Sequence, residues 1–180
     1  TASREVPAGI ISSKNALIFV IVNCLLFIAT TFFINQICLF LSPIALFVIL
    51  FYSYTKRFTA LCHLVLGVGL SLAPIGAYLA VIGQFDNSIP LLFSAIVFTW
   101  VSGFDIMYAL QDEEFDSEYN LHSIPVFLGR KNALLTSRIL HIITACLIIL
   151  PIVGVAIGKG SAAIFMTSYS LGAIIFISLL

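Results

Sequence analysis

The chain has 180 residues, of which 61% are hydrophobic and 9% are charged, and its mean hydropathy is +1.17. A soluble domain carries about 25% charged residues, so this composition excludes a soluble globular protein. The formal net charge is zero, which gives no indication of a nucleic-acid partner.

Long uncharged runs predict helices that cross a membrane. The first run extends from residue 15 to residue 55, and four shorter runs follow it. Because about 20 apolar residues cross a bilayer as a helix, the first run is long enough for two crossings, with Asn35 and Gln36 as the polar turn. The sequence therefore predicts an all-α polytopic bundle with six spans. They cover residues 15–34, 37–54, 61–82, 90–104, 134–157 and 161–180.

Two of these spans have features of their own. Pro74 lies inside the third span, where neighbouring helices can satisfy the carbonyl that it frees. Gly67 and Gly69 in the same span are predicted to lie at a helix–helix contact. The fourth span is short, and we expect it to continue as a helix through Asp105 and Tyr108 into the acidic segment that follows.

The positive charges predict an orientation. When the loops alternate sides, one side holds Arg4, Lys14, Lys56, Arg57, Arg130, Lys131 and Arg138, and the other side holds only Lys159. The positive-inside rule places the larger group in the cytoplasm. The basic loop at residues 56–57 and the acidic segment are therefore expected to face the same compartment, the cytoplasm.

Six of the eight acidic residues lie between Asp105 and Glu118. The spacing of Asp105, Asp112 and Asp116 would place them within roughly 40° of one another on a helix, with Tyr108 on an adjacent edge. Three carboxylates on one stripe repel each other unless a cation lies between them. Mg²⁺ commonly binds one or two carboxylates while substrate phosphates complete its shell. We therefore expect these aspartates to hold Mg²⁺ on one helical face, turned toward a cavity.

A solvated acidic loop that caps a membrane helix is the alternative interpretation of this segment. The position of Asp105 at the end of an apolar span favours a functional role, because a carboxylate is costly there. Glu113 is a further candidate for the metal face, whereas Glu114 and Glu118 are expected to be solvated.

Three stretches of the sequence carry a resemblance. They read DIMYALQDEEFD at residues 105–116 with LHSIP at 121–125, YSYTKRFT at 52–59, and TASREVPAG at 1–9. They resemble the second aspartate-rich motif, the basic loop, and the segment after the first aspartate-rich motif of the UbiA superfamily of intramembrane aromatic prenyltransferases. The second motif most resembles the 4-hydroxybenzoate polyprenyltransferase branch.

The resemblance implies a nine-helix membrane protein of which this chain holds the third to eighth helices. The first aspartate-rich motif and the terminal helices are expected outside residues 1–180. The implied activity is Mg²⁺-dependent transfer of a polyprenyl group from polyprenyl diphosphate to 4-hydroxybenzoate in ubiquinone biosynthesis, in the bacterial inner membrane. Dihydroxynaphthoate and homogentisate are alternative aromatic acceptors. Because the first motif would supply half of the metal site, we expect residues 1–180 alone to be inactive.

The same resemblance suggests roles for single residues. Lys56 and Arg57 would contact diphosphate oxygens directly, with a role in topology alone as the alternative, and Arg4 is a weaker candidate of the same kind. His122 would donate to phosphate, act as a base, or stabilise the loop. Tyr108, beside the aspartates, would shield the allylic cation with its aromatic face.

Two other functional classes stay open. A transporter or channel would use Asp105 as an ion site, but it would also predict acidic residues in other spans, which contain none. The second open class is a purely structural membrane subunit with a solvated acidic loop. Mg²⁺-dependent binding of a prenyl diphosphate would separate the enzyme from both. His63 and His141 are expected near helix ends, without a catalytic role.

Overall fold

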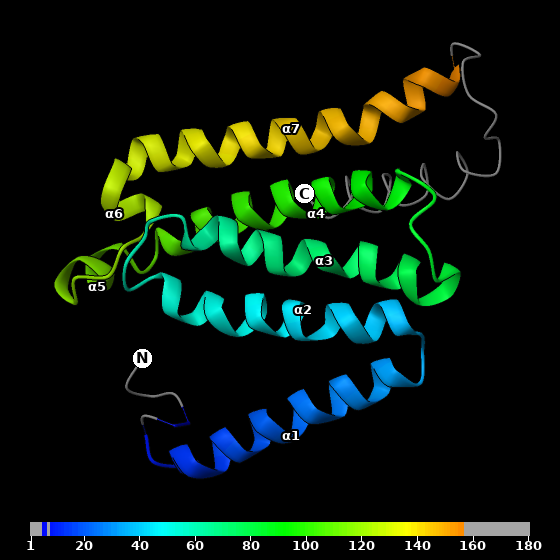
Figure 1. Cartoon of the computed structure of the whole chain (residues 1–180). Coiled ribbons are helices and arrows are strands. Elements are labelled where there is room, and N and C mark those ends of the chain that lie inside the picture. The colour runs from blue at the N-terminus through cyan, green and yellow to red at the C-terminus, as the bar shows by residue number, and fades with distance from the viewer. Residues whose placement is uncertain (1–4, 7, 157–180) are drawn as a thin grey trace.

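The computed structural model describes residues 5, 6 and 8–156, and its secondary structure in this part of the chain is entirely helical (Figure 1). The long helices are α1 (Ser13–Phe32), α2 (Gln36–Thr55), α3 (Cys62–Ile82), α4 (Ile89–Ala109) and α7 (Arg130–Ala156). Two short helices, α5 (Glu113–Glu118) and α6 (Ile124–Leu128), lie between α4 and α7. The predicted all-α membrane bundle is confirmed.

Five helices of the described part are long and apolar enough to cross a membrane, and they correspond to the first five predicted spans. The first four agree with the prediction to within a few residues, and α4 continues as a helix through Asp105 and Tyr108 to Ala109, as predicted. Helix α7 begins at Arg130 rather than at residue 134. The sixth predicted span, residues 161–180, lies outside the described residues.

The turn between α1 and α2 shows how the sequence sets a helix boundary. The Asn35 side chain accepts a hydrogen bond from the Cys38 backbone N–H at 2.8 Å, which caps α2 as an N-terminal asparagine commonly does. Its amide nitrogen also donates to the Leu79 carbonyl at 2.8 Å, near the end of α3. The predicted polar turn is confirmed, and it joins three helices.

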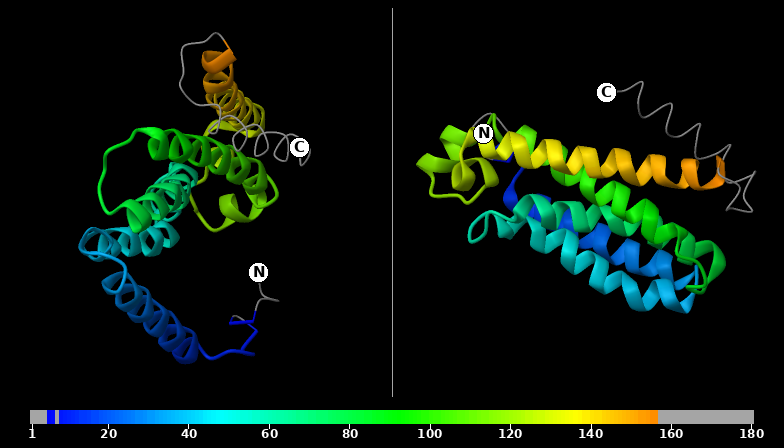
Figure 2. Two further views of the ribbon diagram at one scale, coloured as in Figure 1. Left: turned by 90° about the vertical axis from the view of Figure 1, so that its right-hand side faces the viewer. Right: turned by 90° about the horizontal axis from the view of Figure 1, so that it is seen from above.

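The long helices follow one another in space in chain order, so that α1 and α7 lie at opposite ends of the row (Figures 1 and 2). Helix α4 packs between α3 and α7 and is the most buried of the five candidate spans. Large apolar side chains on the outside of the bundle, such as Phe40 and Phe47, are exposed in the way expected of a lipid-facing surface.

Close contact between α3 and α4 depends on a glycine. A Cβ atom added at Gly67 would lie 2.1 Å from Ser102 Oγ and 3.0 Å from the Phe98 carbonyl oxygen. The prediction that Gly67 lies at a helix–helix contact is confirmed. A Cβ at Gly69 would be 3.8 Å from Ile49 on α2, which is an ordinary contact.

Helices α4 and α7 are joined by polar side chains in an apolar setting. Thr99 and Thr144 share a hydrogen bond of 2.7 Å between their hydroxyl oxygens, and Ser137 Oγ donates to the Gly103 carbonyl at 2.7 Å. Such contacts satisfy polar groups that would otherwise be unpaired in hydrocarbon.

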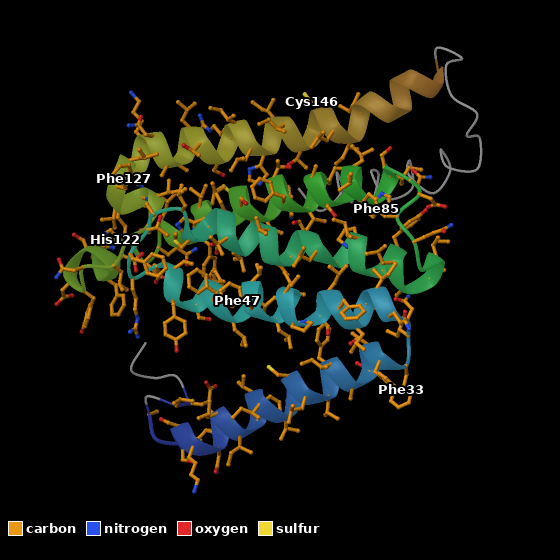
Figure 3. All side chains as sticks on the ribbon, viewed as in Figure 1. Phe33, Phe47, Phe85, His122, Phe127 and Cys146 are labelled. Carbon is orange, nitrogen blue, oxygen red and sulfur yellow. The ribbon has the colours of Figure 1, made fainter. Side chains whose placement is uncertain are left out.

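The bundle has one end that holds the α2–α3 connection (residues 56–61) and the α4–α7 connection (residues 110–129). We call it the loop end. Figure 3 shows His122 and Phe127 at the loop end, and Phe33 and Phe85 at the opposite end. The basic loop and the acidic segment therefore lie at the same end of the bundle, as the sequence predicts.

Candidate functional site

The acidic segment does not continue the α4 helix. Helix α4 ends at Ala109, and Asp112 stands at the N-cap position of α5. The acidic residues in the first turn of α5, Glu113, Glu114 and Asp116, explain this break, because negative charge is favourable at a helix N-terminus and unfavourable at a C-terminus. The prediction that Asp105, Asp112 and Asp116 share one helical face is wrong.

A cavity at the loop end nevertheless brings two of these aspartates together. It has a volume of about 320 Å³. Its lining comes from α2, α3, α4 and the connections that follow α2 and α4. The lining residues are Tyr52, Ser53, Lys56, Cys62, His63, Asp105, Tyr108, Ala109 and Asp112. Asp105 reaches the cavity from the last turns of α4, and Asp112 reaches it from the start of α5.

Lys56 brings a positive charge to this cavity. It lies directly after α2, and its Nζ is 2.7 Å from Asp116 Oδ1. The Asp116 side chain is fully buried, whereas the Lys56 side chain is 32% exposed. The prediction that Lys56 or Arg57 approaches the same cavity as the aspartates is confirmed by Lys56. Asp116 does not line the cavity, but its carboxylate binds the Lys56 ammonium group, which does.

His63 pairs with Asp105. This histidine is buried in the first turn of α3, and its Nδ1 lies 2.7 Å from Asp105 Oδ2. On the other side of the ring, the backbone N–H of Ile124 points at Nε2 across 3.4 Å. One imidazole thus connects α3, the end of α4 and the start of α6.

The segment before α6 also fixes the rest of the cavity wall. The His122 backbone N–H donates to the Lys56 carbonyl at 2.7 Å, and the Cys62 thiol lies 3.6 Å from the His122 carbonyl. Residues 122–124 are therefore bonded to Lys56 and to the first turn of α3, which carries Cys62 and His63. The His122 residue itself is exposed and is not part of the cavity lining.

The remaining predicted positions lie apart from the cavity or at its edge. Tyr108 lines it and is 56% exposed, with its ring stacked beside Phe104. Arg57 is exposed, lies over the Tyr54 ring at 5.7 Å, and lines a separate groove between α1 and α2. Arg4 lies outside the described residues.

The glutamates of α5 face away from the cavity. Glu113 lies 3.8 Å from Arg130 and, with Glu114 and Glu118, lines a shallow hollow on the outer side of α5. Glu114 and Glu118 are exposed, as predicted, and Glu113 does not join Asp105 and Asp112.

Sequence reasoning missed Tyr52 and His63 as cavity residues. The sequence could have predicted Tyr52, because it precedes Lys56 by one helical turn and shares its face of α2. No sequence pattern could have predicted His63, since its partner Asp105 is 42 positions away. The prediction that His141 lies near a helix end is wrong: it lies well inside α7, with Nδ1 2.8 Å from the Ser137 carbonyl.

The donor set of the cavity favours a cation that arrives with its own ligands. Within residues 5, 6 and 8–156, no group of three or more His, Cys, Asp and Glu side chains is placed to hold a metal ion alone. Asp105 and Asp112 supply two carboxylates, and Mg²⁺ typically binds one or two carboxylates together with substrate phosphates. The residues present therefore fit a Mg²⁺–diphosphate pair.

Comparisons with known proteins found similar sequences. A model described as the UbiA prenyltransferase family matches residues 1–180. A 4-hydroxybenzoate octaprenyltransferase of Tolumonas auensis is 34% identical over 134 residues, which are 74% of this chain and 46% of that protein. The enzyme of the same name in Francisella tularensis subsp. novicida is 33% identical over 134 residues, 73% of this chain and 46% of that one.

A solved structure is similar as well. The apo structure of a UbiA homologue from Aeropyrum pernix K1 has a TM-score of 0.81 and 33% sequence identity, covering 98% of this chain and 65% of that one. The chain spans about half the length of the curated relatives it matches.

Proposed function

The chain belongs to the UbiA prenyltransferase family, and from this premise we propose that the protein transfers a polyprenyl group from polyprenyl diphosphate to 4-hydroxybenzoate. The name of the curated relatives supports this acceptor, and the product would serve quinone biosynthesis. Since the chain spans about half of those relatives, the activity is proposed for the full-length protein.

One observation carries the proposal: the cavity at the loop end gathers Asp105, Asp112 and Lys56 next to two tyrosines, Tyr52 and Tyr108. Carboxylates, a primary ammonium group and aromatic faces are what an allylic diphosphate requires. The carboxylates hold its counter-ion, the ammonium binds its oxygens, and the aromatic faces shield the carbon end.

Asp105 and Asp112 would hold Mg²⁺ in this site. When bound, Mg²⁺ neutralises the charge of the diphosphate, which makes it a better leaving group. Asp116 stays a candidate ligand of the same ion, but its carboxylate would have to exchange Lys56 for the metal.

Lys56 is the best placed of the proposed diphosphate contacts. Its ammonium group can donate to diphosphate oxygens from the position that it already occupies at the cavity. Arg57 is directed into the groove between α1 and α2, and we propose for it, Arg4 and His122 only contacts with substrate atoms outside the cavity.

The aromatic wall has a separate task. After the carbon–oxygen bond breaks, the allylic cation must be kept from water until the acceptor ring attacks it. The Tyr108 ring, with Tyr52 as a second aromatic residue of the lining, provides faces that attract a cation. The polyprenyl chain would extend from the cavity along the apolar surface of the bundle into the bilayer.

The orientation of the bundle follows from its charges. Lys14, Lys56, Arg57, Arg130 and Lys131 belong to the loop end, so we propose that this end faces the cytoplasm and that the membrane is the bacterial inner membrane.

The test is prenyl transfer by the full-length protein in membranes. Polyprenyl diphosphate is supplied with 4-hydroxybenzoate, dihydroxynaphthoate or homogentisate, with Mg²⁺ or with a chelator. We expect a prenylated 4-hydroxybenzoate that forms only with Mg²⁺. Product with another acceptor alone would reassign the substrate, and diphosphate binding without any product would contradict the transferase.

A further inference from the structure

The tautomer of His63 is set by its surroundings. The Ile124 backbone N–H can only donate, and it faces Nε2 across 3.4 Å, so Nε2 is placed to accept from it. An ionised carboxylate can only accept, so Nδ1, 2.7 Å from Asp105 Oδ2, bears a hydrogen and donates it to the carboxylate. Turning the ring over would break both contacts. Because His63 is only 3% exposed, water could not replace them.

This hydrogen bond determines how Asp105 presents itself to the cavity. Oδ2 is taken by His63, so Oδ1 is the oxygen left for a ligand. The Asp105 side chain is 25% exposed, which leaves it accessible from the cavity that it lines. A carboxylate that binds a metal is commonly held by a hydrogen bond of this kind, and losing the partner weakens metal binding about 10- to 100-fold.

The support behind His63 is itself fixed. Ile124 begins α6 and is buried, and His122, two residues earlier, donates its backbone N–H to the Lys56 carbonyl. The same short segment is therefore bonded to the imidazole of His63 and to the backbone of Lys56, two residues that line the cavity.

We propose that His63 is a positioning residue of this site. Its Nδ1–H orients the Asp105 carboxylate for a divalent cation bound with diphosphate, and its Nε2 anchors the ring to the start of α6. The assignment rests on the proposed function and deepens it, because it names a residue that acts on the cation through Asp105 rather than by contact.

Three substitutions separate the two ends of the ring. His63→Asn keeps an amide nitrogen about where Nδ1 lies and loses the link to Ile124. His63→Gln keeps an amide about where Nε2 lies and loses the donor to Asp105. His63→Ala removes both. His141→Asn is the matched control, since His141 is a partly buried membrane histidine on α7 that does not line the cavity.

The main readout is Mn²⁺ binding to the full-length protein in the presence of inorganic diphosphate, followed by the electron paramagnetic resonance signal of free Mn²⁺. We expect His63→Ala and His63→Gln to weaken binding roughly tenfold or more, His63→Asn to stay within a few-fold of wild type, and His141→Asn to change nothing. The Mg²⁺ concentration for half-maximal prenyl transfer should rise in the same order.

The unfolding midpoint of each variant separates positioning from general support. Wild-type Mn²⁺ affinity in His63→Gln, with or without a lower midpoint, would overturn the proposal, and so would equal losses in His63→Asn and His63→Gln. If His63→Ala does not fold, these two conservative variants decide. A wild type that binds Mn²⁺ and diphosphate but transfers no prenyl group would refute the proposed function alone. Absence of Mn²⁺ binding in the wild type would refute the His63 proposal.

Discussion

At the scale of single residues, the three aspartates of the loop end differ in the partners of their carboxylates. Asp105 is bonded to His63, and Asp116 is paired with Lys56. Asp112 lines the cavity from the N-cap position of α5, where no capping hydrogen bond from its side chain is formed. Replacing the Asp112 carboxylate therefore breaks neither of these two pairs, which makes Asp112 the clearest position for a functional test.

Asp112→Asn in the full-length protein keeps the shape of the side chain but removes a charge and a strong metal ligand. The diphosphate charge would then be less neutralised as the carbon–oxygen bond breaks, and prenyl transfer should fall roughly 10²-fold or more. Glu118→Gln is the control, because Glu118 is exposed on the outer side of α5. Equal rates of transfer to 4-hydroxybenzoate for both variants would favour a merely solvated acidic segment.

Lys56→Met should destabilise the protein through Asp116. The fully buried carboxylate would lose its ion-pair partner, and breaking a buried pair in this way costs about 3–5 kcal/mol, less where one partner is partly exposed as Lys56 is. A second substitution, Asp116→Asn, removes the stranded charge and should restore much of the stability. SDS-induced unfolding followed by circular dichroism measures the effect.

Arg130→Met is the control for this cycle. Arg130 is 68% exposed and 3.8 Å from Glu113, so its removal should hardly move the unfolding midpoint. If Lys56→Met shifts the unfolding midpoint as little as Arg130→Met, the ion pair between Lys56 and Asp116 does not contribute to stability.

At the scale of helices, α4 is the element that positions the site. Its last turns carry Asp105 and Tyr108, and its packing on α3 keeps Asp105 within reach of His63. That packing depends on the absence of a side chain at Gly67, opposite Ser102. In a membrane, where helices gain no hydrophobic energy by leaving lipid, such close approach is a main source of association.

Gly67→Ala should separate α3 from α4. The added Cβ would overlap Ser102 Oγ and press on the Phe98 carbonyl, and overpacking of this kind costs roughly 1–3 kcal/mol. Ser102→Ala in the same protein should recover part of the loss, because the Phe98 carbonyl still stands 3.0 Å away. Thermal unfolding in detergent is the measurement, and Gly69→Ala, with its nearest neighbour at 3.8 Å, should behave like wild type. Equal stability of the two glycine variants would show that the α3–α4 contact is not tight.

At the scale of the whole molecule, the row of antiparallel helices puts every connection that carries the site at one end. Figures 1 and 3 show the short helices α5 and α6 and the labelled His122 and Phe127 there. Basic residues gather at the same end, so the proposed reaction would take place at the cytoplasmic surface of the bilayer.

Single cysteines report this orientation directly. In a full-length protein without its natural cysteines, Phe127→Cys lies at the loop end and Phe85→Cys at the opposite end, and both positions are exposed. In intact cells, a maleimide that does not cross membranes should label Phe85→Cys, whereas Phe127→Cys should react only after the cells are opened. The reverse pattern would place the cavity outside the cytoplasm.

The sequence by itself determined the class of the molecule and its family. Runs of uncharged residues set the crossings, because a bilayer demands about 20 apolar residues for each helix, and five of the six predicted spans are described and confirmed. The order of the motifs predicted the family, which the match over residues 1–180 shows. The sequence also predicted that Lys56 or Arg57 approaches the aspartates, since alternating spans return both loops to one end, and Lys56 does so.

Only the tertiary structure decided how the cavity is composed. The single helical stripe of aspartates failed because the spacing rule assumes an unbroken helix, and the acidic residues start a new one after Asp112. The pairing of Asp105 with His63 was beyond the sequence because it joins positions 42 apart. Which faces of α3 and α4 meet is decided by packing at Gly67 and Ser102, and helical periodicity within one span carries no information about its neighbour's rotation.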